Sequence, residues 1–336
     1  MNPDRPPLLR RLWGVSVLLT GLLLVSVVLG LGLGSAQPRL TESLAIIFGQ
    51  ADPESITATI IWRLRLPRVI LAALVGATLS LGGLVFQALL RNPLAEPYIL
   101  GVSGGSAVGA ILGIWLGLAP FPGVALLAFA GSMATLFLVL IMAAGRAASQ
   151  KGSLLLAGVM VNAFCSAIIM FFISITQDAR LHNIIYWLMG DLSQAAPDRL
   201  LVLLYLLPPC FVLIFALARP MNLLALGEEV AMYMGINVRT VSYVLLIATS
   251  LMVSAIVCQS GLVGFVGLVI PHLLRLVLGP DHRLLIPACV LGGGSYLVLC
   301  DLLSRVLPSQ GEMPVGVITA IIGAPLFILL LQRTRG

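Results

Sequence analysis

Residues 65–97 read RLPRVILAALVGATLSLGGLVFQALLRNPLAEP, and this stretch decides the class of protein. Its central run, 66–89, carries one charged side chain, Arg68, and is bounded by Arg65 and Arg91. A helix needs about 20 consecutive apolar residues to cross the hydrocarbon core of a bilayer. The run therefore predicts a transmembrane helix with basic residues at both ends.

The composition of the whole chain agrees with this interpretation. Of the 336 residues, 60% are hydrophobic and 10% are charged, whereas a soluble domain carries about 25% charged residues. A soluble chain this apolar would expose too much hydrocarbon to water. The net charge of +6 comes mostly from arginines at the ends of apolar runs, where they contact lipid headgroups or a protein partner. We therefore expect a lipid bilayer, and no nucleic acid, among the partners.

Apolar runs recur along the chain and predict an all-α integral membrane protein with about ten transmembrane helices in a single domain, 1–336. The first run exceeds the apolar part of a signal peptide, about 7–15 residues, so we expect a retained helix. The eighth run is short and contains Pro271, which predicts a broken or strongly tilted span. The runs are 12–34, 66–89, 97–118, 123–145, 153–176, 199–218, 240–259, 262–277, 284–303 and 314–332.

The distribution of basic residues predicts the orientation. An even number of spans puts both termini on one side, and with that side in the cytoplasm the inner segments hold twelve of the 19 basic residues. We therefore expect both termini in the cytoplasm of a bacterium, with the protein in its inner membrane. The outer cluster Arg63, Arg65 and Arg68 breaks the positive-inside pattern, which suggests that these arginines have a function.

Glycine recurs every fourth residue from 101 to 117, at positions 101, 105, 109, 113 and 117. On a helix this spacing makes a continuous stripe without side chains, along which a neighbouring helix can approach closely. Tight packing against another helix is the simpler interpretation. A helix that lines a transport pathway is the alternative.

The turn 91–97 joins two predicted spans on the cytoplasmic side. Its two prolines, Pro93 and Pro97, forbid a continuous helix, and Asn92 and Glu96 can cap the N-terminus of the following helix. The segment is either a plain tight turn or a gate at the mouth of a pathway.

Residues 226–236, LGEEVAMYMGI, predict a short amphipathic helix flanked by Gly227 and Gly235 in the longest cytoplasmic connection. Two adjacent carboxylates, Glu228 and Glu229, beside Met and Tyr side chains suit docking into the groove of a partner protein. An interfacial helix that lies on the membrane is the alternative.

Two histidines and the cysteines are the candidate ligands in the sequence. His272 could meet a haem-like substrate or carry a proton, but an interfacial histidine bonded to nearby backbone is the preferred interpretation. His182 is expected in a solvated outer loop that contains a short interfacial helix, with a role at a substrate entrance as the alternative. No His, Cys or carboxylate pair has metal-ligand spacing, and the five cysteines form no CxxC pair.

The energy source must lie outside this chain. The sequence has no GxxxxGK[ST] motif, so it cannot bind ATP as a P-loop protein, and we expect no enzyme activity, no catalytic residue and no cofactor in it. An ion-coupled secondary transporter, the main alternative, needs ionisable groups near the middle of the membrane. Asp301 and Glu96 instead lie near the ends of predicted spans, which favours a separate ATPase subunit.

From about residue 60 to the C-terminus, the sequence resembles the permease subunits of the type II ABC importers for iron chelates (siderophore or haem) and vitamin B12. The segments that carry the resemblance are RLPR (65–68), RNPLAEP (91–97), GVSGG (101–105), LLLAG (154–158), YWLMG (186–190), RPMN (219–222), LGEE (226–229), GFVGLVIPHLLR (264–275), DHR (281–283), EMPVG (312–316) and GAP (323–325).

This resemblance implies a vitamin B12 importer permease-like fold and a homodimer with about twenty helices. It further implies two ATPase subunits that bind ATP and Mg, a periplasmic substrate-binding protein, and import of a large metal chelate (iron–siderophore, haem or cobalamin) by alternating access. The implied sites are three. The residues implied to dock the binding protein are Arg65, Arg68 and Arg305. The part implied to couple to the ATPase is a helix at about 225–235, with Leu226, Gly227, Glu228, Glu229, Met232 and Gly235. The residues implied to form the cytoplasmic gate are Asn92, Leu94, Lys151 and Gly152.

Overall fold

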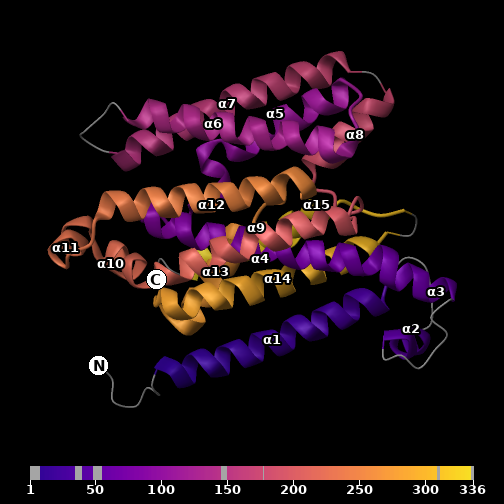
Figure 1. The fold of residues 1–336 in the computed structure, drawn as a ribbon, viewed down its shortest axis with the longest axis horizontal. Helices are drawn as coiled ribbons and strands as arrows, with labels where there is room; N and C mark the ends of the chain where they lie inside the picture. Colours follow the sequence, from indigo (N-terminus) through magenta and orange to yellow (C-terminus); the bar gives the residue numbers. More distant parts are fainter. Residues whose placement is uncertain are drawn as a thin grey trace.

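The computed structural model describes residues 8–34, 40–47, 55–144, 150–176, 178–308 and 311–333. Within these ranges the chain is helical and contains no strand. The long helices run side by side along the longest axis of the molecule (Figure 1). An all-helical bundle is expected of a chain in lipid, because a helix satisfies its backbone hydrogen bonds within one segment.

Seven helices in the described ranges are long and apolar enough to cross a membrane, and three shorter apolar helices accompany them. Together they match the ten predicted runs, so the predicted fold class is confirmed. The ten are α1 (Leu8–Gly32), α4 (Leu66–Leu90), α5 (Val102–Trp115), α6 (Ala125–Ala144), α7 (Gln150–Ile175), α9 (Pro197–Ala216), α12 (Val238–Ser260), α13 (Val266–Leu278), α14 (His282–Val306) and α15 (Val315–Arg333).

Shorter elements connect these helices. They are α2 (Leu40–Ile47), α3 (Ile56–Thr59), α8 (Asp178–Leu188), α10 (Ala218–Leu226), α11 (Glu228–Tyr233), the π-helical segments η1 (Ile60–Arg65) and η3 (Pro120–Val124), and the 3₁₀ turn η2 (Pro97–Leu100). The short helix predicted within 177–198 is therefore present as α8, between α7 and α9.

Helix α4 is the centre of the bundle, and most of its side chains are buried against α12, α13 and α14. Small residues make this possible, because a Cβ added at Gly83 would lie 1.9 Å from the carbonyl oxygen of Gly267 in α13. By contrast, α1 and α7 expose most of their apolar side chains. Close backbone approach at glycine is the usual packing of membrane helices.

The glycine stripe packs α5 against α6. A Cβ added at Gly109 would lie 2.0 Å from the Leu127 oxygen, and one at Gly105 would lie 2.4 Å from the Gly131 oxygen. Tight packing, the simpler of the two interpretations, is thus what the structure contains from position 105 to 113. Gly117 follows the end of α5 and has no atom within 4 Å of an added Cβ.

The eighth span begins later in the structure than the predicted run, 262–277. Residues 261–264 are not helical, Phe265 has a left-handed backbone with φ 68°, and α13 begins at Val266. Pro271 lies inside α13, which continues through it without a break. The span is therefore short, as predicted, but it is not broken at the proline.

The bundle has two distinct ends (Figure 1). The start of α1, the end of α15, α10 and α11 lie at one end, which we call the terminal end. Helices α2, α3 and α8 lie at the other, which we call the α8 end. Both ends of the described chain thus share one end of the bundle, as an even number of spans requires.

Candidate functional site

The three arginines predicted to dock a partner come together at the α8 end. Arg65 immediately precedes α4, Arg68 lies in its first turn, and Arg305 lies in the last turn of α14. They converge because α4 packs against α14 with the start of one helix beside the end of the other. All three side chains are buried.

A buried carboxylate holds this cluster together. Asp301 is fully buried, and its Oδ1 lies 2.8 Å from Arg68 Nε while its Oδ2 lies 3.0 Å from Arg305 Nε. A buried charge is tolerated only beside opposite charges, and Asp301 has two: Arg68 donates a hydrogen bond to it, whereas Arg305 acts by charge and donates from Nε to the Asp301 backbone oxygen. The spacing of Asp301 and Arg305, four residues apart on one helix, was a signal in the sequence that the docking interpretation did not use.

Arg65 and Arg305 also cap the C-terminal end of α1. Arg305 donates to the Gly30 oxygen at 3.0 Å, and Arg65 donates to the Leu31 oxygen at 2.8 Å. The last carbonyl groups of a helix lack partners within the helix, and arginine side chains satisfy them here. The cluster therefore joins α1, α4 and α14 at the α8 end, and its predicted role in docking stays a prediction.

A second carboxylate, Glu312, reaches Arg68 from the segment between α14 and α15. Its oxygen pairs with Arg68 Nη1, and 37% of its side chain is exposed. Sequence reasoning used Glu312 only as part of a motif and did not connect it with Arg68, because 244 residues separate the two.

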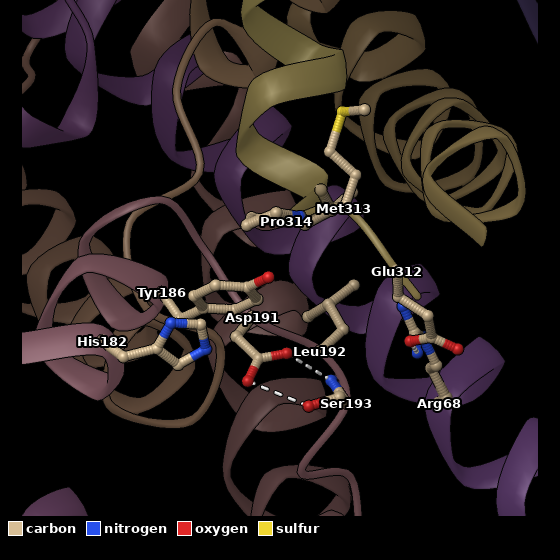
Figure 2. A pocket seen from close by; sticks show the side chains of 10 residues that line it. Arg68, His182, Tyr186, Asp191, Leu192, Ser193, Glu312, Met313 and Pro314 are labelled. Atoms are coloured by element: carbon tan, nitrogen blue, oxygen red, sulfur yellow. Dashed lines mark hydrogen bonds and ion pairs between the residues drawn. The ribbon is translucent and has the colours of Figure 1, made fainter. Parts of the chain in front are cut away.

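A hollow of about 180 Å³ lies beside this pair. Figure 2 shows Arg68 and Glu312 on one flank and His182, Tyr186 and Asp191 on the other. The Asp191 carboxylate accepts hydrogen bonds from Ser193 N at 2.7 Å and Ser193 Oγ at 2.9 Å.

A second hollow of about 560 Å³ shares His182, Tyr186, Asp191 and Ser193 with the first. It adds two basic side chains, Arg180 and Arg199, beside apolar ones such as Leu118 and Trp187, so α8 lines two neighbouring hollows of mixed character. His182 is exposed in α8 and packs on Tyr186, with ring centroids 4.3 Å apart. Its position fits both earlier interpretations, the solvated residue and the entrance residue.

At the terminal end, the predicted single helix at 225–235 is divided into two. Gly227 has φ 145° and ψ 147°, a conformation that favours glycine, and it separates α10 from α11. Leu226 belongs to α10, and only Glu228–Tyr233 forms the second helix, with Gly235 beyond it at φ 81°. We call α10, Gly227 and α11 the elbow.

The outer face of the elbow is exposed. Leu226, Glu229, Met232 and Tyr233 are exposed, and the exposed fraction of Tyr233 is 91%. The inner face of the elbow is apolar, because Met221, Leu224 and Ala231 are buried in the core. The amphipathic character that the sequence predicted is thus present, with a different boundary.

Two polar residues, Arg91 and Asn222, anchor the elbow to spans. Arg91, the residue that ends α4, donates from Nε to the Leu224 oxygen at 3.1 Å and places Nη2 3.9 Å from a Glu228 oxygen. Asn222 donates to Asp281 at 2.8 Å and accepts from the amide of His282, at the start of α14, at 2.9 Å. Burial alone would raise the pKa of Asp281, but hydrogen bonds from Arg283 and Asn222 lower it to about 2.

The turn after α4 is capped within itself. The Asn92 side chain accepts from Leu94 N at 2.9 Å, whereas Glu96 makes no capping hydrogen bond to the next helical turn. The prediction that both residues cap the following helix was therefore wrong, because the Asn92 side chain bonds two residues ahead in its own turn. Burial raises the pKa of Glu96.

Leu94 is exposed at this turn, Lys151 lies in the first turn of α7, and Gly152 is exposed after it. Residues 145–149, which precede α7, lie outside the described residues. The gate role of Asn92, Leu94, Lys151 and Gly152 stays a prediction.

His272 has no backbone partner, so its preferred interpretation was wrong. Its exposed fraction is 8%, and neither ring nitrogen has a hydrogen-bond partner among the described residues. Its ring meets the edge of Phe327 in α15, with centroids 6.1 Å apart. The proline one residue earlier and the packing of α13 on α15 place it in the helix interface instead.

Comparison with known proteins agrees with this architecture. The chain is 41% identical to an ABC transporter permease, YvrB, of Bacillus subtilis over 93% of this chain and 91% of the relative. It is 39% identical to the haemin transport permease HmuU of Yersinia pestis over 95% of this chain and 96% of the relative. It is 42% identical to the vitamin B12 import permease BtuC of Klebsiella pneumoniae over 82% of this chain and 83% of the relative.

The fold also matches a solved structure described as an inward-facing conformation of a metal-chelate type ABC transporter. The TM-score is 0.84 at 32% identity, over 95% of this chain and 99% of the other. The sequence matches the FecCD transport family over residues 22–333, nearly the whole chain. The resemblance inferred from the motifs is thereby confirmed, and the chain belongs to the FecCD transport family.

Proposed function

We propose that this chain is the permease subunit of an ATP-driven importer that moves a large metal chelate from a periplasmic binding protein into the cytoplasm. The observation that carries the proposal is the elbow, an exposed two-helix surface anchored by polar contacts to α4 and α14. Such a surface can pass a movement of a partner to the spans that it touches.

The elbow is the proposed contact with the ATPase subunits, which bind ATP and Mg. Exposed Met232 and Tyr233 supply an apolar contact, and Glu229 supplies charge, a combination suited to a groove on a partner. Because α4 is the most buried span, a force applied to the elbow reaches the core of the bundle rather than its edge. The spans would then alternate between outward-facing and inward-facing packings.

The cargo class follows from the relatives. Their names specify haemin and vitamin B12, and the matched structure is of the metal-chelate type. We infer a large metal chelate, with iron–siderophore, haem and cobalamin as the candidates. The docking of a binding protein is assigned to the α8 end, where the arginines and the two hollows lie.

The working unit is proposed to be a homodimer in the bacterial inner membrane, with both termini in the cytoplasm. One helix, α7, exposes large apolar side chains along its length, among them Phe164, Met170 and Phe171. In a single copy such a surface needs lipid or a second copy to cover it. The pathway would run between the two copies.

A secondary transporter that acts without an ATPase is the alternative. It needs an ionisable group that can exchange protons or ions near the middle of the membrane. Asp301 lies near the end of α14 and is held by two arginines, which suits a structural role. Nothing in the described spans favours the alternative over the importer.

The test is purification of the tagged chain in mild detergent from its native membrane, followed by mass spectrometry and uptake assays. We expect an ATPase subunit to co-purify in near-equal amount. In proteoliposomes supplied with the binding protein, we expect uptake of haemin, cyanocobalamin or ferrichrome only when ATP is present. Uptake by the chain alone without ATP would overturn the proposal.

A further inference from the structure

The Arg68 guanidinium lies between two carboxylates that differ greatly in exposure. Asp301 contacts Arg68 Nε and has a fully buried side chain, whereas Glu312 contacts Nη1 and exposes 37% of its side chain. The Arg68 side chain itself is only 10% exposed. Arg68 lines the hollow beside Glu312, so a partner can approach its guanidinium from there.

The two carboxylates have different roles. Asp301 also pairs with Arg305 at 3.0 Å, so its loss would leave two buried cations without their shared partner. Among the described residues, Glu312 forms its ion pair with Arg68, and Arg305 lies within range of its charge without contacting it. Glu312 lies in the segment between α14 and α15, at the rim of the 180 Å³ hollow (Figure 2). Asp301 is fixed in the core, and Glu312 can be exchanged.

We propose that Glu312 is an intrachain stand-in for a carboxylate of the docking protein, and that docking exchanges one for the other on Arg68. The inference rests on the proposed docking at the α8 end. Since an exchange of like charges keeps the charge around Arg68 constant, no buried cation is left unpaired at any stage. The partner must present an aspartate or glutamate on a protruding surface.

The size of the hollow agrees with a single entering side chain. The hollow has a volume of about 180 Å³ and is open on one side, so a carboxylate side chain can enter it beside Arg68 and Glu312.

The segment that carries Glu312 is also tied to α8. Met313 N donates to the Ser304 oxygen at 3.0 Å, and Val315 N donates to the Gly190 oxygen at 3.1 Å, just beyond the end of α8. A Cβ added at Gly316 would lie 2.1 Å from the Met189 oxygen. Glu312 thus lies three residues before a backbone contact with the end of α8, the helix that lines both hollows.

The test measures docking with Glu312→Gln. The full transporter is held in nanodiscs, and the probe is the cargo-free substrate-binding protein that co-purifies with it, with Kd measured at about 50 mM salt to limit screening. Because glutamine carries no charge, it no longer competes with a carboxylate of the binding protein for Arg68, and we expect Kd to fall about tenfold. The Kd of Glu312→Asp should lie between those of wild type and Glu312→Gln. Glu42→Gln is the matched control, because it removes an exposed charge at the same end whose partner is Thr57, and it should leave Kd within about twofold.

The outcomes separate the inference from the docking proposal. Arg63→Glu changes an exposed arginine in the same stretch and should weaken docking. Suppose that Arg63→Glu weakens docking, but that Glu312→Gln leaves Kd unchanged, raises it, or changes it no more than Glu42→Gln does. The proposed exchange is then overturned, while the docking proposal stands. If Arg63→Glu also has no effect, the docking proposal fails with it. Monodisperse elution of each variant is required, and Glu312→Asp provides the measurement should the glutamine variant aggregate.

Discussion

At the scale of single residues, burial separates arginines that look alike in the sequence. Arg63, Arg65 and Arg68 form one outer cluster by position, yet Arg65 and Arg68 are buried with partners inside the chain and Arg63 is exposed. Reversal of the charge on Arg68 would place a third carboxylate against Asp301 and Glu312. Arg63 is therefore the residue at which docking can be tested without damage to the fold.

Arg63→Glu is expected to raise the Kd for the binding protein by about threefold to tenfold at low salt, with a smaller effect at high salt, because an exposed charge acts mainly through screened attraction. Surface plasmon resonance at two salt concentrations measures this. A Kd that is independent of both the substitution and salt would contradict docking through this face.

Asp301→Asn is expected to lower stability strongly. It leaves Arg68 and Arg305 buried without their common carboxylate, and loss of one partner in a buried ion pair costs about 3–5 kcal/mol. Thermal unfolding in detergent, followed by size-exclusion chromatography of heated samples, should give a clearly lower Tm than wild type. Asp198→Asn, an exposed control in the first turn of α9, should leave Tm unchanged, and equal Tm values for both variants would argue against a structural role for Asp301.

At the scale of elements, the elbow has an exposed and an anchored side. Its outer face is exposed, while Arg91 and Asn222 connect its inner side to the end of α4 and the start of α14. Arg91 itself has a left-handed backbone, φ 48°, which a residue other than glycine adopts uncommonly. In the proposed function, binding of the ATPase and transmission to the spans therefore rest on different residues and can be tested separately.

Glu229→Arg and Arg91→Gln should separate these two steps. Glu229 is exposed, so its reversal should reduce the amount of ATPase that co-purifies, whereas Arg91→Gln should leave the ATPase bound but reduce uptake by about fivefold or more relative to ATP hydrolysis. Quantitative mass spectrometry and paired uptake and hydrolysis assays measure the two effects. If Arg91→Gln lowers hydrolysis and uptake in equal proportion, the anchor does not transmit the movement.

The Asn222–Asp281 contact should depend on pH only in acid. Hydrogen bonds lower the pKa of Asp281 from 3.8 to about 2, so its stabilising effect is fully present above the ordinary value and is lost as pH falls through the lowered one. The difference in Tm between wild type and Asp281→Asn should be constant from pH 8 to about 5 and should narrow below about 4. A difference that already changes between pH 8 and 6 would contradict this assignment.

At the scale of the whole molecule, one copy leaves a large apolar surface for lipid or a second copy. The exposed side chains of α7 contrast with the buried side chains of α4, although both helices are apolar throughout. Native mass spectrometry of the purified permease is expected to give a mass of two 35.5 kDa chains. A single chain that supports ATP-dependent uptake would contradict the homodimer.

Local hydropathy was enough to predict the helices and the fold class. Transfer of each apolar residue into lipid is favourable wherever it lies in the chain, so a run of about 20 such residues predicts a span without knowledge of its neighbours. The amphipathic pattern of 226–236 likewise predicted an exposed helix there. Its division at Gly227 was missed, because glycine fits both the end of a helix and a bend within one.

The candidate site depended on contacts that no local pattern contains. Arg68 meets Asp301 and Glu312 across 233 and 244 residues of sequence, and Arg91 meets the elbow across 133. His272 lies in a helix interface instead of bonding to backbone for the same reason, since the partner helix α15 comes from the end of the chain.

By itself, the sequence determined that this is a membrane protein, roughly where its helices begin and end, and which family it belongs to. The tertiary structure decided which charges are buried, which carboxylates pair with Arg68 and Arg305, and which helices the elbow contacts. The physical reason is that transfer into lipid is a sum over neighbouring residues, whereas pairing of buried charges depends on which helix ends meet in space.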